Sequence, residues 1–140
     1  MHKHFEVLIS YNGICPETGK EKKFKELYLF EAVSFTDCEA QAIEFAEKSL
    51  SQEFFIENIN PVKYDEIHLN GGDYFYKCKI MSLIEDDSGK TKKSYSNHLL
   101  QADKFDQIDE ILEIFMQGVI IPWVNKSVIE SKIVDVCIDY

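Results

Sequence analysis

The sequence repeats itself at an offset of half its length, which constrains the fold more than any other feature. The motif Gly-Lys-x-Lys-Lys begins at Gly19 and again at Gly89, 70 residues later in a chain of 140. An internal repeat of this length predicts two lobes, 1–70 and 71–140, that share one topology and form one compact domain. Further residues match at the same offset: Leu29 and Leu99, Ala32 and Ala102, Phe35 and Phe105, Phe45 and Phe115.

Each half begins with two segments that favour β-strands. The first half contains "HFEVLISY" and "FKELYLFEAV", and the second contains "YFYKCKIMSLI" and "SYSNHLLQA". Alternating apolar residues with many aromatic and β-branched side chains are typical of half-buried strands. The sequence therefore predicts a β-hairpin in each half, with the lysine cluster just past its turn.

A helix and an extended segment follow each hairpin. Thr36 and Glu39 are spaced as a capping box after Phe35, and Asp106 and Asp109 take these places in the second half. One apolar stripe at helical spacing then includes Ile108, Ile111, Leu112, Phe115, Met116 and Val119. We expect an α+β protein of two β-β-α-β lobes, with antiparallel sheet and one helix per lobe, joined at residues 70–73.

Charge excludes several partners. The formal net charge is −10, and all 15 basic residues are lysine. Duplex DNA and anionic membranes repel such a chain, and no arginine is present for bidentate phosphate recognition. No apolar run approaches the ~20 residues that span a bilayer, and the N-terminal segment does not read as a signal peptide. These features predict a cytoplasmic protein that does not enter membranes.

No motif predicts catalysis, a cofactor or a metal site. The four cysteines are widely spaced, which favours reduced and mostly buried thiols. His2 and His4 could chelate a metal adventitiously, but no cysteine–histidine pair has the close spacing of a zinc site. A nucleophile–base pair could be composed from Cys78 or Cys137 with His68 or His98, but no hydrolase, nucleotide or metalloprotease motif supports one.

Several passages resemble a known family. They are "YLFEAVSFTDCEAQ" after the first hairpin, "YKCKIM" leading to "SGKTKK", and "IVDV" near the end. Together they resemble a domain-of-unknown-function family, about as long as this chain, that gut Bacteroidetes, their phages and mobile elements encode. The family commonly has Glu-Ala where this chain has Asp37-Cys38. The resemblance implies a small accessory protein and supplies no catalytic residues.

These features predict a non-catalytic protein that binds a partner macromolecule. An acidic surface can engage a basic protein, so a counter-defence or regulatory inhibitor is one form of this function. The aromatic residues exceed what two small lobes readily bury, which predicts interface contacts and a homodimer. The interface candidates are Phe54, Tyr74, Phe75 and Trp123.

The alternative function uses the two lysine hairpins. Cations beside aromatic faces can bind single-stranded nucleic acid or a signalling nucleotide. The simpler explanation is that glycine supplies the turn and exposed lysines keep a sheet edge soluble. The lysines that would bind the ligand in the alternative function are Lys20, Lys22, Lys23, Lys90, Lys92 and Lys93.

Overall fold

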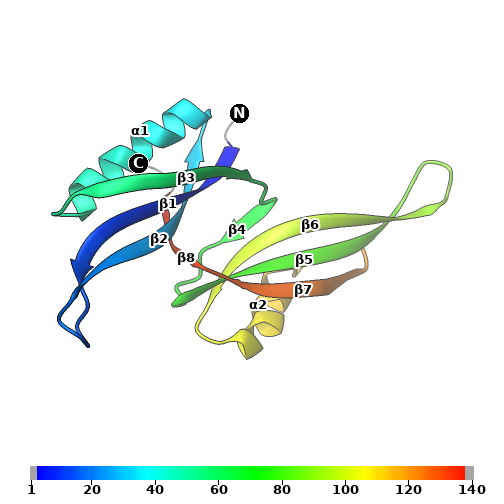
Figure 1. Ribbon diagram of the computed structural model, residues 1–140. Helices are drawn as coiled ribbons and strands as arrows, with labels where there is room; N and C mark the ends of the chain where they lie inside the picture. Colours follow the sequence, from blue (N-terminus) through cyan, green and yellow to red (C-terminus); the bar gives the residue numbers. More distant parts are fainter. Residues whose placement is uncertain (1–2, 138–140) are drawn as a thin grey trace. The chain divides into compact units, whose positions relative to one another are not determined.

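A computed structural model of the chain describes residues 3–137 and has an α+β fold (Figure 1). These residues form two α-helices, a short 3₁₀-helix and two mixed sheets of four strands each, which confirms the predicted α+β class. The elements are β1 (Lys3–Ile14), β2 (Glu21–Ala32), α1 (Phe35–Ser49), β3 (Phe54–Val62), β4 (Glu66–His68), β5 (Tyr74–Glu85), β6 (Thr91–Ala102), η1 (Phe105–Gln107), α2 (Ile108–Phe115), β7 (Trp123–Ser131) and β8 (Ile133–Cys137).

The chain divides into two compact units. Of the described residues, unit 1 contains 3–63 and 132–137, and unit 2 contains 64–131. The chain therefore passes from one unit to the other twice. The expected lobes 1–70 and 71–140, by comparison, meet at a single junction.

The sheet of unit 1 has the strand order β3-β1-β2-β8. β1 and β2 form an antiparallel hairpin, and β3 pairs antiparallel with β1. β8 pairs parallel with β2, with Cys137 opposite Phe30. Helix α1 lies along one face of this sheet (Figure 1).

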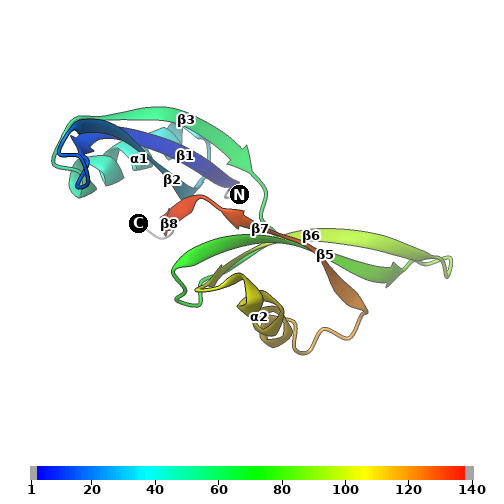
Figure 2. The ribbon, with the colours of Figure 1, turned by 60° about the horizontal axis from the view of Figure 1, so that its bottom comes forward.

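The sheet of unit 2 has the strand order β4-β6-β5-β7. β5 and β6 form an antiparallel hairpin, and β7 pairs antiparallel with β5. β4 pairs parallel with β6, with Glu66 opposite His98. Helix α2 lies against one face of this sheet (Figure 2).

The fourth strand of each sheet comes from the other half of the sequence. β4 follows β3 along the chain but pairs with β6, and β8 follows β7 but pairs with β2. Both of these pairings are parallel. The expected antiparallel arrangement is therefore correct for three strands of each sheet and wrong for the fourth.

The two hairpins resemble each other in detail. Gly19 and Gly89 have φ angles of 69° and 83° in their turns, a region that glycine adopts without steric cost. The strand that pairs with the first strand of each hairpin is also irregular at a matching place: the β1–β3 register shifts after Leu8, and the β5–β7 register shifts after Lys79. The turns thus lie where the lysine clusters predicted them.

The helix starts differ from the predicted capping boxes. Ser34, not Thr36, caps α1, because its Oγ accepts a hydrogen bond from the Asp37 amide at 3.1 Å. The second start is a 3₁₀ turn in which Gln107 Oε1 accepts from the Lys104 amide at 3.2 Å. Asp106 therefore does not cap it. In both cases a polar side chain within two residues of the expected one accepts a hydrogen bond from a backbone amide near the helix start.

Each helix covers an apolar core. In unit 1, Phe5, Val7, Phe30 and Ala42 belong to this core, and in unit 2 the stripe residues Ile108 and Leu112 are buried by the sheet. α2 ends at Phe115, so Val119 lies beyond the helix.

The cysteines are free thiols, and three of them are buried, as the spacing predicted. Burial raises the pKa of Cys38 to about 11 and that of Cys78 to about 12. Among residues 3–137, no helix is long and apolar enough to cross a membrane.

Candidate functional site

Strand β4 is short, but its pairing with β6 is reinforced at both ends. At its start, the Asp65 amide donates to the Asn97 carbonyl at 2.8 Å, and the Asn97 amide donates to Asp65 Oδ2 at 2.7 Å. After its end, Asn70 Oδ1 accepts from the Gln101 amide, and Gln101 Oε1 accepts from the Gly71 amide, both at 3.1 Å. These bonds fix the side chains of β4 against those of β6.

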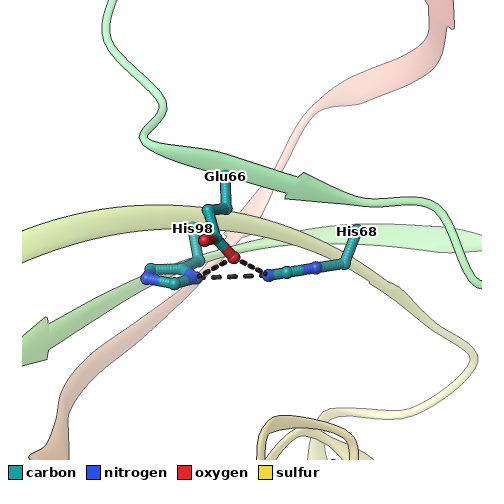
Figure 3. Close-up of side chains that lie close together, drawn as sticks. All are labelled: Glu66, His68 and His98. Carbon is teal, nitrogen blue, oxygen red and sulfur yellow. Dashed lines mark hydrogen bonds and ion pairs between the residues drawn. The ribbon is translucent and has the colours of Figure 1, made fainter. Parts of the chain in front are cut away.

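This pairing brings Glu66, His68 and His98 together, and we call them the His–Glu cluster (Figure 3). The distance from His68 Nε2 to His98 Nδ1 is 3.3 Å, and from His68 Nε2 to Glu66 Oε2 it is 3.2 Å. Glu66 Oε2 lies 4.0 Å from His98 Nδ1. All three ligand atoms therefore face one point.

The cluster combines buried rings with an exposed carboxylate. The side chains of His98 and His68 are 5% and 12% exposed, whereas that of Glu66 is 59% exposed. The His68 ring stacks on Phe115 of α2, with 4.0 Å between ring centroids. The histidines are thus held in place, and the carboxylate is reachable from solvent.

Burial lowers the pKa of both imidazoles, and the nearby Glu66 carboxylate opposes this shift only in part. Both rings are therefore neutral at neutral pH. Ser96 Oγ lies 2.9 Å from His98 Nε2. When this nitrogen donates its proton to the hydroxyl oxygen, Nδ1 directs its lone pair at the other two residues.

The spacing rules did not find this cluster, because its two histidines are 30 residues apart. The alternation Glu66-x-His68 was a usable signal, since it places both side chains on one face of a strand. What the sequence did not reveal was the parallel partner of that strand. Of the nucleophile–base pairs considered from the sequence, Cys78 lies directly opposite His98 in the β5–β6 register, but burial raises the pKa of its thiol to about 12, which disfavours the reactive thiolate.

Unit 1 carries different chemistry at the corresponding positions. β8 pairs with β2 in the register that β4 adopts against β6. Asp135 therefore lies opposite Tyr28, as Glu66 lies opposite His98, and Cys137 takes the position of His68. Burial raises the pKa of Tyr28, whose hydroxyl lies 3.3 Å from Glu26. Within the part of the chain that the structure describes, a group of three metal-ligating side chains occurs in unit 2 alone.

A second feature of unit 2 is an open groove between α2 and β7, which we call the α2–β7 groove. Its larger part has a volume of about 650 Å³ and is lined by Asp109, Leu112 and Glu113 of α2 and by residues 120–125, which include Ile120 and Trp123. A neighbouring depression of about 480 Å³ shares Asp109 and adds Asp106. The groove therefore combines apolar side chains with the carboxylates of Asp106, Asp109 and Glu113.

The interface candidates divide by burial. Tyr74 is 52% exposed, and Trp123 lies half-buried in the α2–β7 groove. Phe54 packs against the core of unit 1. Phe75 is only 2% exposed, so its selection as an interface residue is corrected, since a buried ring cannot contact a partner. Its alternation in β5 did not distinguish the two faces, because both are largely buried near the strand's start.

The lysine hairpins lie in different units, and two of their lysines form ion pairs with carboxylates. Lys23 Nζ is 2.7 Å from Glu57, and Lys92 Nζ is 3.6 Å from Asp86. Lys22 lies over the Phe24 ring at 5.7 Å. The remaining cluster residues, Lys20, Lys90 and Lys93, are exposed.

The fold and the cluster together define an α+β protein with two mixed four-stranded sheets and a buried histidine pair in unit 2. The chain belongs to the family described as a domain of unknown function (DUF4494), whose model matches residues 3–140. The resemblance to a domain-of-unknown-function family is thereby confirmed. No curated protein and no solved structure matches the chain.

Proposed function

We propose that this chain is a non-catalytic binding protein whose partner is a protein with a basic and apolar surface segment. The observation that carries the proposal is the α2–β7 groove, which combines exposed apolar side chains with carboxylates. Ile120, which lines the groove, is 96% exposed. An isoleucine side chain this exposed to water is unfavourable in free energy, so contact with a partner would stabilise it. Asp109 and Glu113 of α2 line the same groove.

Charge complementarity favours a basic partner. Three carboxylates and a single lysine line the two parts of the groove, and the whole chain carries a net charge of −10. Such a surface attracts Lys- or Arg-rich segments and repels acidic ones. The buried Asn125 Oδ1 in the groove has no hydrogen-bond partner among the described residues, so a donor from water or from a partner would stabilise it.

The test begins with selection of a random peptide library on the immobilised full-length chain. We expect enrichment of peptides that combine lysine or arginine with large apolar residues. The variant Glu113→Lys/Ile120→Ser is then expected to weaken binding of an enriched peptide by about tenfold or more, measured by fluorescence anisotropy. Both side chains are exposed, so folding is expected to be unaffected.

A matched control carries the same changes in unit 1. Glu47→Lys/Ile14→Ser alters an exposed carboxylate and an apolar side chain that is 70% exposed, and it should bind the peptide as the wild type does. Equal loss in both double variants would show that net charge alone drives binding. Enrichment of acidic peptides would contradict the proposal directly.

The second candidate is a binder of single-stranded nucleic acid or a signalling nucleotide through the lysine hairpins. The observation in its favour is the pairing of exposed lysines with aromatic rings, such as Lys22 with Phe24. The variant Lys20→Gln/Lys22→Gln/Lys90→Gln/Lys92→Gln separates the two functions. It should retain the basic peptide, whereas salt-sensitive binding of a thymidine oligonucleotide that disappears in this variant would favour the second candidate.

The proposal includes a homodimer. Among the strands that the structure describes, β7 pairs with β5 alone, so its other edge is available for strand addition between two copies. Val124 and Ile129 on β7 are 46% and 62% exposed, which supports apolar contact there. We expect light scattering to give the dimer mass at high micromolar concentration, and the substitution Lys126→Pro to shift it toward the monomer mass. A monomer in the wild type would remove the dimer from the proposal.

We also infer that the chain arose by duplication of a β-β-α-β unit. The order of elements, the turn glycines and the matching register shifts support this origin. The proposed setting is the cytoplasm of a bacterial host, where a phage or mobile element encodes the protein, as the family resemblance implied.

A further inference from the structure

We propose that Glu66, His68 and His98 form a binding site for a divalent transition-metal ion of the zinc class. This inference goes beyond the proposed partner binding and does not depend on it. It rests on the convergence of two imidazole nitrogens and one carboxylate oxygen, whose ligand atoms all lie within 4.8 Å of one another. Figure 3 shows the three side chains turned toward a common point.

The spacing of the ligand atoms fits a tetrahedral ion. With metal–ligand distances of about 2.0–2.1 Å, two ligand atoms of a tetrahedral zinc site lie ~3.3–3.4 Å apart. The His68 Nε2–His98 Nδ1 and His68 Nε2–Glu66 Oε2 distances are 3.3 and 3.2 Å. Only the third edge is long, at 4.0 Å. Glu66 is exposed and can close this difference by a small rotation of its side chain.

The number of protons shared by the three ligand atoms also favours a bound cation. In the tautomers that carry the proton of each ring on Nε2, His98 donates to Ser96, and the single proton on His68 Nε2 faces two acceptors, His98 Nδ1 and Glu66 Oε2. One donor satisfies two acceptors poorly. A bound cation that displaces this proton would satisfy all three ligand atoms together.

Neighbouring residues hold the two histidines in place, as they do in known metal sites. A ligating histidine usually donates the N–H of its other ring nitrogen to a fixed acceptor, and Ser96 Oγ, 2.9 Å from His98 Nε2, is placed to accept such a bond. Phe115 holds the His68 ring by stacking.

The donor set indicates the class of ion. Two imidazoles and one carboxylate suit Zn²⁺, Co²⁺, Ni²⁺ or Cu²⁺, whereas Mg²⁺ and Ca²⁺ prefer oxygen ligands. Three protein ligands leave the fourth position of a tetrahedral ion for water or for a group of a bound partner.

The test titrates the chelator-treated full-length chain with Zn²⁺ by calorimetry and with Co²⁺ by visible absorption. We expect one ion per chain and the absorption bands of four-coordinate Co²⁺. Ser96→Ala removes the hydrogen bond that orients His98 and should weaken binding by about 10–100-fold. His68→Gln and His98→Gln each remove a ligand and should weaken it further.

His2 and His4 supply the matched control, because they are the other two histidines of the chain. The variant His2→Gln/His4→Gln is expected to bind Zn²⁺ as the wild type does. Binding lost in this variant but retained in His68→Gln would overturn the proposal, as would a wild type that binds neither ion at micromolar concentration.

Folding is controlled separately, since His98 is buried. Glu66→Gln changes an exposed side chain and should weaken Zn²⁺ binding at least about tenfold while the fluorescence of Trp123 stays native. Unchanged Zn²⁺ affinity in a folded Glu66→Gln variant would remove the carboxylate from the site and contradict the three-ligand assignment.

Discussion

Deletion of residues 132–140 is expected to unfold unit 1 and to leave unit 2 folded. These residues include β8, which completes the sheet of unit 1 next to β2. Cys137 belongs to the core of unit 1, and Ile133 is 5% exposed. Loss of these buried side chains costs on the order of 3–5 kcal/mol, a large part of the stability of a small unit.

Two internal reporters distinguish the units. The single tryptophan, Trp123, lies in unit 2, so its fluorescence reports on that unit. Cys38 is buried in unit 1 and Cys78 in unit 2, and burial raises both thiol pKa values, which slows alkylation in the folded state. In the truncated chain, mass spectrometry is expected to find Cys38 alkylated and Cys78 protected.

A pair of point variants on β8 provides the control. Ile133→Ala should destabilise unit 1 by about 2–4 kcal/mol, whereas Val134→Ala, at a side chain that is 48% exposed, should cost under about 1 kcal/mol. Simultaneous labelling of Cys38 and Cys78 in the truncated chain would show instead that the two units unfold together.

Gly72→Ala is the second substitution for which we expect a large effect. A Cβ atom at Gly72 would lie 2.4–2.6 Å from three backbone atoms of Ala102 at the end of β6. Backbone cannot rotate away as a flexible side chain can, so the turn before β5 must shift. We expect a loss of about 3 kcal/mol in the free energy of unfolding of unit 2, measured by urea titration of Trp123 fluorescence.

The neighbouring glycine separates close packing from backbone conformation. Gly71 has a φ of 86°, but nothing lies within 4 Å of the place that a methyl group would take there. Gly71→Ala should therefore cost only about 1 kcal/mol, from the left-handed conformation alone. Equal effects of the two substitutions would show that the Gly72 contact relaxes easily, contrary to our expectation.

Local patterns predicted most of the fold. Alternating residues identified both hairpins, and the turn glycines Gly19 and Gly89 located their tips, because these signals act within a few residues. The helix positions followed from apolar spacing. Their caps were displaced, because Ser34 and Gln107 offered acceptors as good as the ones expected at Thr36 and Asp106.

Long-range pairing could not be read in the same way. β4 has only three residues and no distinctive composition, so nothing in its sequence names β6 as its partner. The His–Glu cluster exists only through that pairing, and therefore it escaped spacing rules that assume ligands close in sequence. The α2–β7 groove likewise depends on the loop after α2, where Ile120 is exposed rather than buried.

The exchange of β4 and β8 sets an order of events during synthesis. Unit 2 is one continuous segment, so all its strands are available once residue 131 has left the ribosome. The sheet that contains β1 must wait for Ile133, which pairs with Leu27 across more than a hundred positions of chain. Contacts this distant in sequence form late. The part of the protein made first is thus the last to be completed, and until then the open edge of β2 is exposed to chaperones and to other nascent chains.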